Sequence, residues 1–308
     1  MSALGELHRL GSTKTGPPRS RDNKAAFLFL LPWFAGLLLI TAGPVAASFV
    51  LGFTDYNLLQ PPEFNGLDNV ERMIGDERLH QALGVTFKYV LISVPLQLAA
   101  ALGLAMLLDK GLRGLAFYRS AFYLPSLLGS SVAIAVLWRQ IFGAEGLFNQ
   151  VLAMVGVSGR GWISDPDTAL STLIVLNVWT FGAPMVIFLA GLRQIPVMYY
   201  EAADVDGASK WRQFVRITVP LLSPIIFFNL VLQIIHAFQS FTQAFVVSGG
   251  TGGPSDSTLF YTLYLYQRGF NNFDMGYASA LAWLLLLIIA AFTAVNFWAA
   301  KHWVFYDD

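Results

Sequence analysis

Long apolar stretches dominate the chain after its first two dozen residues. Each is long enough to cross a hydrocarbon layer of about 30 Å as a helix, which takes roughly 20 residues. They lie at 25–53, 83–108, 120–142, 169–192, 221–247 and 277–298. The pattern predicts an all-α integral membrane protein with six transmembrane helices, in which residues 1–24 form a polar tail and residues 25–308 the membrane domain.

The first apolar stretch, 25–53, follows a basic tail, as the core of a signal peptide would. It is too long for such a core, which spans about 7 to 15 residues, and no small-residue cleavage site is evident. We interpret it as a retained first span.

Basic residues distinguish the two sides of the predicted membrane domain. Six spans place both termini on one side, and Lys and Arg gather in cytoplasmic segments. The tail, the second and fourth loops and the C-terminus hold thirteen of the nineteen basic residues, and the opposite side holds six. The termini and the loop at 193–220 are therefore predicted to be cytoplasmic.

Composition excludes several functions. Apolar residues make up 56% of the chain, charged residues 12%, and the formal net charge is zero, which does not suggest a nucleic-acid partner. There is no cysteine, and the four histidines lack metal-ligand spacing. No catalytic set and no G-x-x-x-x-G-K-[ST] loop occurs, so we expect no enzyme activity and no nucleotide site in this chain.

The fourth loop, 193–220, reads as two short cytoplasmic helices. Pro196 suits a helix start, Gly207 can adopt the left-handed conformation that ends a helix, and Ser209 can cap the next. Pro220 is expected to disfavour helix at Val219 and to mark the entry to the fifth span. The loop has more apolar side chain than it can bury alone, so it needs a partner protein, its own bundle or lipid headgroups.

Particular residues of this loop resemble the EAA loop of permease subunits of binding-protein-dependent ABC importers. In that family the loop is the helix that docks on the cytoplasmic ATPase. The resemblance implies that Glu201 makes a polar contact there, that Ala202 and Ala203 allow close approach, and that Gly207 supplies the turn. The residues assigned to coupling in this way are Glu201, Ala202, Ala203, Asp206, Gly207, Ala208, Phe214 and Pro220.

Other segments look like the maltose-type carbohydrate uptake branch of that family. They are Phe122–Pro125, the Trp162 segment, Ala190–Leu192, Gly252–Pro254 and Gly276–Ala280. The Gly-Gly-Pro element resembles the first permease of the pair, although Gly249-Gly250-Thr251 lengthens the glycine-rich loop here. The chain also lacks the large periplasmic insertion and the additional N-terminal spans of the enterobacterial maltose permease.

The resemblance implies the type I importer permease fold in a bacterial or archaeal cytoplasmic membrane. It implies a second permease subunit, two ATPase subunits or one ATPase homodimer, an external solute-binding protein, a sugar or polyol as substrate, and surrounding lipid. ATP and magnesium would be used by the ATPase subunits, and no cofactor is expected on this chain. An ion-coupled secondary carrier is the alternative, and it would be favoured by acidic residues inside the spans, where none falls. A membrane enzyme and a structural scaffold are the remaining readings.

Polar residues inside apolar spans are costly and therefore indicate function. The fifth predicted span carries such residues at helical spacing, which would place them on one face. They are Asn229, Gln233, His236, Ser240 and Gln243, with Gln239 close by. Asn177, Trp179 and Thr180 form a smaller set on the fourth span, and Tyr123 on the third is a further candidate. We predict that these groups line a path for an uncharged polyol, and the opposing interpretation is hydrogen bonding between helices.

Overall fold

The computed structural model describes residues 20–110 and 114–305, and almost all regular structure within them is helical. Contacts divide the chain into two compact units, Met1–Val50 and Leu51–Asp308. Within the described residues, four helices are long and apolar enough to cross a membrane, and two bent helix pairs raise the number to six if each pair is one span. The predicted helical membrane protein is therefore confirmed at this level.

From Ser20 onward the first unit is helical. It contains α1 (Ser20–Gly36), the π-helical η1 (Leu37–Ala42) and α2 (Gly43–Leu51). Residues Phe27–Leu51 make one apolar helix of 25 residues, and Phe29 is 85% exposed. A lone helix with apolar side chains all round needs lipid or another protein around it.

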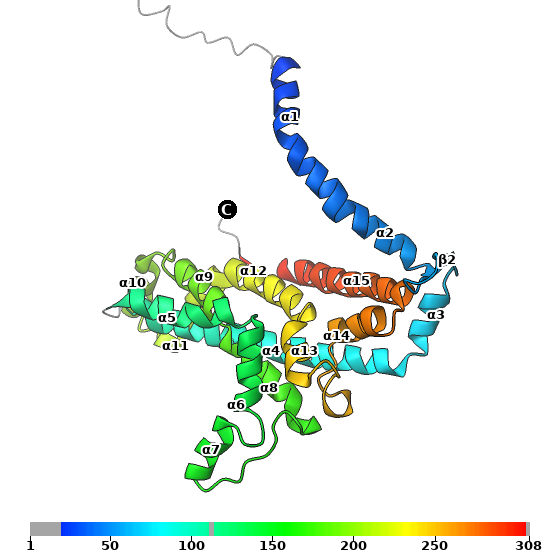
Figure 1. The fold of residues 1–308 in the computed structure, drawn as a ribbon. Coiled ribbons are helices and arrows are strands. Elements are labelled where there is room, and N and C mark those ends of the chain that lie inside the picture. The colour runs from blue at the N-terminus through cyan, green and yellow to red at the C-terminus, as the bar shows by residue number, and fades with distance from the viewer. Residues whose placement is uncertain (1–19, 111–113, 306–308) are drawn as a thin grey trace, which may run out of the picture. The chain divides into compact units, whose positions relative to one another are not determined.

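Helix α4 (Glu77–Asp109) is the centre of the second unit. It has 33 residues, and α8, α9, α12 and α14 pack against it (Figure 1). Its buried positions recur every three or four residues, from Leu79 through Tyr89 and Gln97 to Leu108. At 1.5 Å per residue the helix is about 50 Å long, so it exceeds the hydrocarbon thickness and extends beyond the predicted segment 83–108.

Two predicted spans are broken helices. The segment 120–142 is divided between α5 (Leu115–Leu128) and α6 (Val132–Ile141), which meet at 94°, and 169–192 between α8 (Pro166–Trp179) and α9 (Gly182–Leu192), which meet at 42°. The apolar content of a segment indicates that it is buried or in lipid, but it does not show whether the helix through the segment is continuous. The breaks free backbone groups that require other partners.

The region around Pro220 differs from the sequence prediction. One helix runs from Lys210 to Phe238, through α11 (Lys210–Gln213), the π-helical η2 (Phe214–Thr218) and α12 (Val219–Phe238). Val219 is helical, with φ −63° and ψ −46°. The π-helical turn directly before Pro220 changes the local hydrogen-bond spacing, so the helix accommodates a residue without an N–H.

The fifth predicted span is also shorter than expected. Helix α12 ends at Phe238, and Phe241 leaves the helical region with φ −130° before α13 (Thr242–Ser248) begins. The prediction of one helix over 221–247 was therefore wrong. Gln239 and Ser240 occupy the break. Ser240 Oγ donates to Gln243 Oε1 at 3.4 Å, and the Ser240 carbonyl oxygen accepts from Thr262 Oγ1 at 2.5 Å.

The remaining elements connect or close the bundle. Helix α15 (Met275–Ala300) matches the last predicted span closely. Gly276 of α15 packs directly against the backbone at Thr54, because a Cβ at this glycine would be 2.0 Å from the Thr54 carbonyl oxygen. The other elements are β1 (Thr54–Asp55) antiparallel to β2 (Glu63–Phe64), α3 (Asp68–Ile74), α7 (Leu147–Met154), α10 (Val197–Val205), η3 (Pro254–Asp256), α14 (Tyr261–Tyr266) and η4 (Gln267–Asn271).

Candidate functional site

The helix breaks surround a cavity of about 510 Å³ in the interior of the second unit. Twelve of its sixteen lining residues carry neutral groups able to donate or accept hydrogen bonds, and the apolar ones are Leu176, Ala183, Pro184 and Phe241. The polar lining residues are Tyr89, Gln97, Ser126, Ser130, Asn177, Thr180, Gln233, His236, Gln239, Ser240, Thr242 and Gln243. None of these carries a carboxylate, an ammonium or a guanidinium. We call this space the central cavity.

Most of the path residues chosen from the sequence reach the central cavity. Gln233, His236 and Gln239 do so from α12 and its end, Ser240 from the break that follows, Gln243 from α13 and Asn177 from α8. They do not share one helical face, since α12 stops at Phe238. Their convergence comes from the break, which turns α13 towards the same space.

Three of the chosen residues lie elsewhere. Asn229 is 1% exposed, donates to the Ile225 carbonyl oxygen at 3.0 Å and does not line the cavity. Trp179 packs against Trp138 with ring centroids 6.2 Å apart. Tyr123 lines a neighbouring cavity of about 510 Å³, which shares Ala183 with the central one.

Side chains at the cavity satisfy the backbone groups that the helix breaks set free. Gln243 Nε2 donates to the Gly129 carbonyl oxygen at 3.1 Å, which links the break after α12 to the break between α5 and α6. Gln97 Nε2 and Ser126 Oγ both donate to the Thr180 carbonyl oxygen, at 3.2 and 2.8 Å, at the break between α8 and α9. Irregular backbone at membrane depth occurs where it is buried in protein or lines a cavity, and both conditions hold here.

Thr180 was recognised from the sequence, whereas Gln97 and Ser126 were not. Their signal was an isolated polar residue inside an apolar stretch, the same signal that selected Gln233. It was weaker because Ser and Thr can bond to carbonyls of their own helix and are therefore common in membrane helices.

Close backbone packing holds α9 against α5 beside the cavity. A Cβ at Gly182 would lie 2.4 Å from the Phe122 carbonyl oxygen and 2.8 Å from both Ser126 Oγ and Tyr123 Cα. Backbone atoms cannot move aside as a flexible side chain can. Glycine is therefore the residue that this crossing admits.

We expect Gly182→Ala to lower the thermal unfolding temperature of the purified transporter and to impair uptake, because the added methyl overpacks the crossing by about 1–3 kcal/mol. Gly84→Ala is the matched control, since a Cβ at this α4 position meets nothing within 4 Å. Equal unfolding temperatures for the two variants would contradict the packing argument.

The segment 193–220 folds as the sequence predicted in its first half. Pro196 precedes α10, Gly207 has φ +69°, and Ser209 Oγ accepts from the Arg212 amide at 3.3 Å. Asp204 joins the two helices, because Lys210 Nζ donates to its Oδ1 at 2.9 Å and Gln213 Nε2 donates to the same oxygen. These bonds from Lys210 and Gln213 lower the pKa of the Asp204 carboxyl.

Half of the eight residues assigned to coupling are exposed. Glu201, Ala202, Asp206 and Gly207 are exposed, whereas Ala203, Ala208, Phe214 and Pro220 are half-buried. Apolar side chains flank them: Val205 is 89% and Trp211 72% exposed. The helix pair therefore presents an apolar surface with an acidic residue in it, held in shape by the Asp204 contacts.

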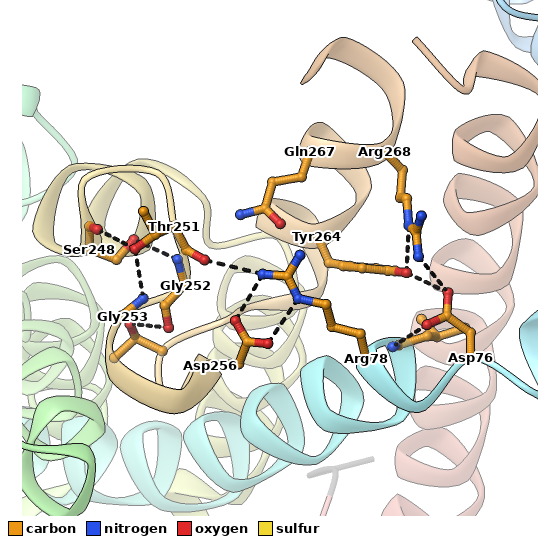
Figure 2. A network of polar contacts seen from close by, with 12 residues as sticks. Asp76, Arg78, Ser248, Thr251, Gly252, Gly253, Asp256, Tyr264, Gln267 and Arg268 are labelled. Atoms are coloured by element: carbon orange, nitrogen blue, oxygen red, sulfur yellow. Dashed lines mark hydrogen bonds and ion pairs between the residues drawn. The ribbon is translucent and has the colours of Figure 1, made fainter. Parts of the chain in front are cut away.

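A second polar network lies at the N-terminal end of α4 (Figure 2). Asp76 caps α4 by accepting from the Leu79 amide at 3.1 Å, and its Oδ2 accepts from the hydroxyls of Tyr264 and Tyr277 and from Arg268. Burial alone would raise the pKa of Asp76, but these donors outweigh it and lower the pKa. Burial and the bond to Asp76 raise the pKa of Tyr264 to about 12. One carboxylate thus ties α4 to α14, η4 and α15.

Comparison with known proteins identifies the family. The family described as "Binding-protein-dependent transport system inner membrane component" matches residues 83–303. The probable ABC transporter permease protein YesP of Bacillus subtilis is 50% identical over 290 residues, 94% of each chain. The lactose transport system permease protein LacF of Rhizobium radiobacter is 32% identical over 282 residues, 90% of this chain and 94% of the relative.

A solved structure shares the fold. It is a bacterial alginate ABC transporter in complex with an alginate pentasaccharide-bound periplasmic protein, and one of its chains superposes with a TM-score of 0.77 at 19% identity, covering 91% of this chain and 95% of that one. The resemblance seen in the sequence is confirmed. The chain is a member of the family of binding-protein-dependent transport system inner membrane components, the permease subunits of ABC transporters.

Proposed function

We propose that this permease and a second permease subunit enclose a path for a saccharide that an external binding protein delivers and that ATP hydrolysis in separate subunits drives. The central cavity carries this proposal. Its amides, hydroxyls and imidazole match the alternating donors and acceptors of a polyol, and it has no charged group that a neutral sugar would have to desolvate. The relative named for lactose transport supports the same substrate class.

We propose six spans, with each bent helix pair counted as one and both termini in the cytoplasm. The distribution of Lys and Arg supports this orientation. The contacts at the two ends of α4 support it as well. Asp109 at the C-terminal end pairs with Arg193 beside α10, and Asp76 caps the N-terminal end. The segment 193–220 and the Asp76 network thus lie at opposite ends of a helix longer than the hydrocarbon layer.

The helix pair α10–α11 is proposed to dock on a cytoplasmic ATPase. Exposed Val205 and Trp211 would be covered there, and Glu201 would pair with a polar or basic group of the partner. Nucleotide and magnesium would then be handled by the ATPase, and this chain would contribute movement of its helices. Phe214 and Pro220 lie where that movement would pass into α12.

Substitution in the central cavity tests the proposed path. Gln239→Ala and Gln233→Ala should each raise the saccharide concentration needed for half-maximal uptake by about three- to tenfold, because each removes a hydrogen bond worth about 0.5–1.5 kcal/mol. The measurement is ATP-dependent uptake into proteoliposomes containing the whole transporter. Gln150→Ala is the control, since the side chain of this exposed glutamine on α7 lies outside the central cavity and donates to the nearby Glu145 carbonyl oxygen.

Unchanged uptake and unchanged selectivity among saccharides in both cavity variants would assign these glutamines to helix packing alone. Uptake by the chain without ATPase subunits, driven by an ion gradient, would refute the ATP-driven mechanism itself.

A further inference from the structure

A third cavity, of about 470 Å³, lies between α6 and the glycine-rich segment after α13. We call it the outer cavity, because the proposed orientation places this end of α6 outside the cell. Its lining residues are Arg139, Gly143, Ile163, Ser164, Val247, Ser248, Thr251, Gly253 and Pro254. Among them Arg139 is the one charged side chain.

The loop wall of the outer cavity is a fixed structure. Ser248 Oγ accepts from the Gly252 amide at 3.3 Å, and Thr251 Oγ1 accepts from the Gly253 amide at 3.2 Å. Arg78 then fastens the loop to α4, with two bonds to the Asp256 carboxylate at 2.8 and 2.9 Å and one to the Thr251 carbonyl oxygen at 3.3 Å (Figure 2). A wall held in this way can present its hydroxyl groups in a constant position.

Arg139 faces this wall without a counter-charge. Among residues 20–110 and 114–305, no carboxylate forms an ion pair with it and no group accepts a hydrogen bond from it, whereas six aspartates pair with other basic residues. The loop runs close by without a side chain, because a Cβ at Gly249 would lie 3.9 Å from Arg139 Nη1. A guanidinium beside hydroxyl groups is a receptor for an anion, and it matches a carboxylate with two parallel N–H donors.

The outer cavity is aligned with the central one along α6. Ser130, just before α6, lines the central cavity, and Arg139 near its other end lines the outer cavity. Arg139 lies seven residues after the start of α6 at Val132, which corresponds to roughly 10 Å of helix. Helix α13 packs against α6 over the same interval, from Gln243 at the central cavity to Ser248 at the outer one.

A similar arrangement occurs at the other end of the path. The cavity that shares Ala183 with the central one is lined by Arg119, which likewise has no ion-pair partner within the described residues. A neutral cavity therefore has an arginine-lined cavity at each end. Positive potential at both ends raises the local concentration of an anionic solute, and the neutral centre does not trap it.

We propose that the outer cavity is an entry subsite for the carboxylate of an acidic saccharide, such as a hexuronate oligomer, and that Arg139 is a specificity-determining residue for it. This proposal rests on the proposed function, since it assumes that saccharides pass through the central cavity. The sugar hydroxyls would meet Ser164, Ser248 and Thr251 while the carboxylate meets the guanidinium. Arg119 would receive the same charge as the solute leaves towards the cytoplasm.

The chain contains no cysteine, so the charge at position 139 can be changed chemically in one protein preparation. The Arg139→Cys variant is assembled with its partner permease, ATPase and binding protein in nanodiscs. It is then treated with a cationic trimethylammonium-ethyl or an anionic sulfonato-ethyl methanethiosulfonate. Solute-stimulated ATP hydrolysis is measured with dimers and trimers of hexuronates and with neutral hexose oligomers of equal length. The wild-type complex treated with each reagent controls for cysteines of the partners.

We expect hexuronates to stimulate the wild-type complex and Arg139→Cys to raise the concentration for half-maximal stimulation about tenfold or more, as for loss of a charge-assisted hydrogen bond. The cationic reagent should reverse much of this change and the anionic reagent should increase it. Neutral oligomers should respond equally to both. Arg160→Gln is the control, because this exposed arginine already pairs with Asp165 at 3.2 Å.

Several results would overturn the assignment. Stimulation by neutral oligomers alone, or hexuronate responses that ignore the charge at position 139, would leave the proposed function standing and refute the subsite. A charge effect that appears only in nanodiscs with anionic lipid would assign Arg139 to lipid headgroups. Failure of Arg139→Cys to co-purify with the second permease would assign it to a subunit interface. No stimulation of the wild-type complex by any saccharide would instead refute the proposed function.

Discussion

Replacing Gly207 by valine should reduce solute-stimulated ATP hydrolysis about five- to thirtyfold while the transporter still assembles and its binding protein still binds solute. Gly207 has φ +69° between α10 and α11. A left-handed conformation costs an L-residue roughly 1–2 kcal/mol, and a β-branched residue is the least suited to it. This cost lowers the fraction of transporters in which the turn holds the native angle between α10 and α11. A cost of 1–2 kcal/mol corresponds to about a five- to thirtyfold change in that population.

The effect at Gly207 would come from backbone conformation, because a Cβ there meets nothing within 4 Å. Gly156→Val is therefore a close control: this glycine has φ +76°, equally open surroundings and a place in the loop after α7. Gly207→Asn should be tolerated better than Gly207→Val, since asparagine enters the left-handed region more readily. Coupled uptake by Gly207→Val at the wild-type rate would refute a docking role for the helix pair.

Replacing Asp76 by alanine should lower the thermal unfolding temperature of the transporter by about 6–12 °C. The carboxylate is 9% exposed and accepts hydrogen bonds from the Leu79 amide, two tyrosine hydroxyls and Arg268. Its removal leaves Arg268 without its carboxylate and the hydroxyls without an acceptor, at a cost of about 3 kcal/mol, and each kcal/mol corresponds to roughly 2–4 °C at this chain length. Differential scanning fluorimetry in detergent measures it.

Asp68→Ala is the matched control for Asp76. Asp68 lies exposed in the first turn of α3, where its charge contributes less than about 1 kcal/mol. Asp76→Asn should fall between the two, because the amide keeps an acceptor oxygen but not the charge. A Tm for Asp76→Ala equal to that of Asp68→Ala would show that the network contributes little to stability.

The stabilisation of the folded transporter by the Asp76 carboxylate should change with pH in one definite direction. The folded state lowers the pKa of Asp76 below its ordinary value of 3.8. The carboxylate therefore contributes its full stabilisation at neutral pH and loses it as the pH falls below about 4 towards the folded-state pKa. The Tm difference between wild type and Asp76→Ala should accordingly shrink in that acid range.

Membrane insertion could be predicted from local sequence because it depends on the solvent around each segment. Any stretch such as 277–298 must be helical in hydrocarbon, whatever its neighbours, since no water is present to bond its backbone. Features that depend on backbone conformation could also be predicted from adjacent residues. Gly207 was expected to be left-handed and Ser209 to cap a helix, and both do so because each depends on a few adjacent residues.

Breaks inside the apolar stretches could not be read in this way. Nothing in the sequence around Gly129 and Thr180 predicts a helix end. The helices end beside them because Gln243, Gln97 and Ser126 reach across from other helices to their carbonyl groups. A single helix cannot reveal whether such a partner exists. For the same reason the end of α12 at Phe238 was missed, and Asn229 was expected to line the path although it lies buried away from the cavity.

The sequence by itself determined that this chain is a helical membrane protein of the permease family, since apolar length, charge placement and the motif at 193–220 are properties of consecutive residues. Only the tertiary structure decided where the polar groups converge. It placed Gln233, Gln243 and Asn177 around one cavity, joined Asp76 to Tyr264 and Tyr277, and left Arg139 facing a fixed loop without a counter-charge. These are contacts between residues far apart in the chain, and they form only when separate helices pack and their freed backbone groups find partners.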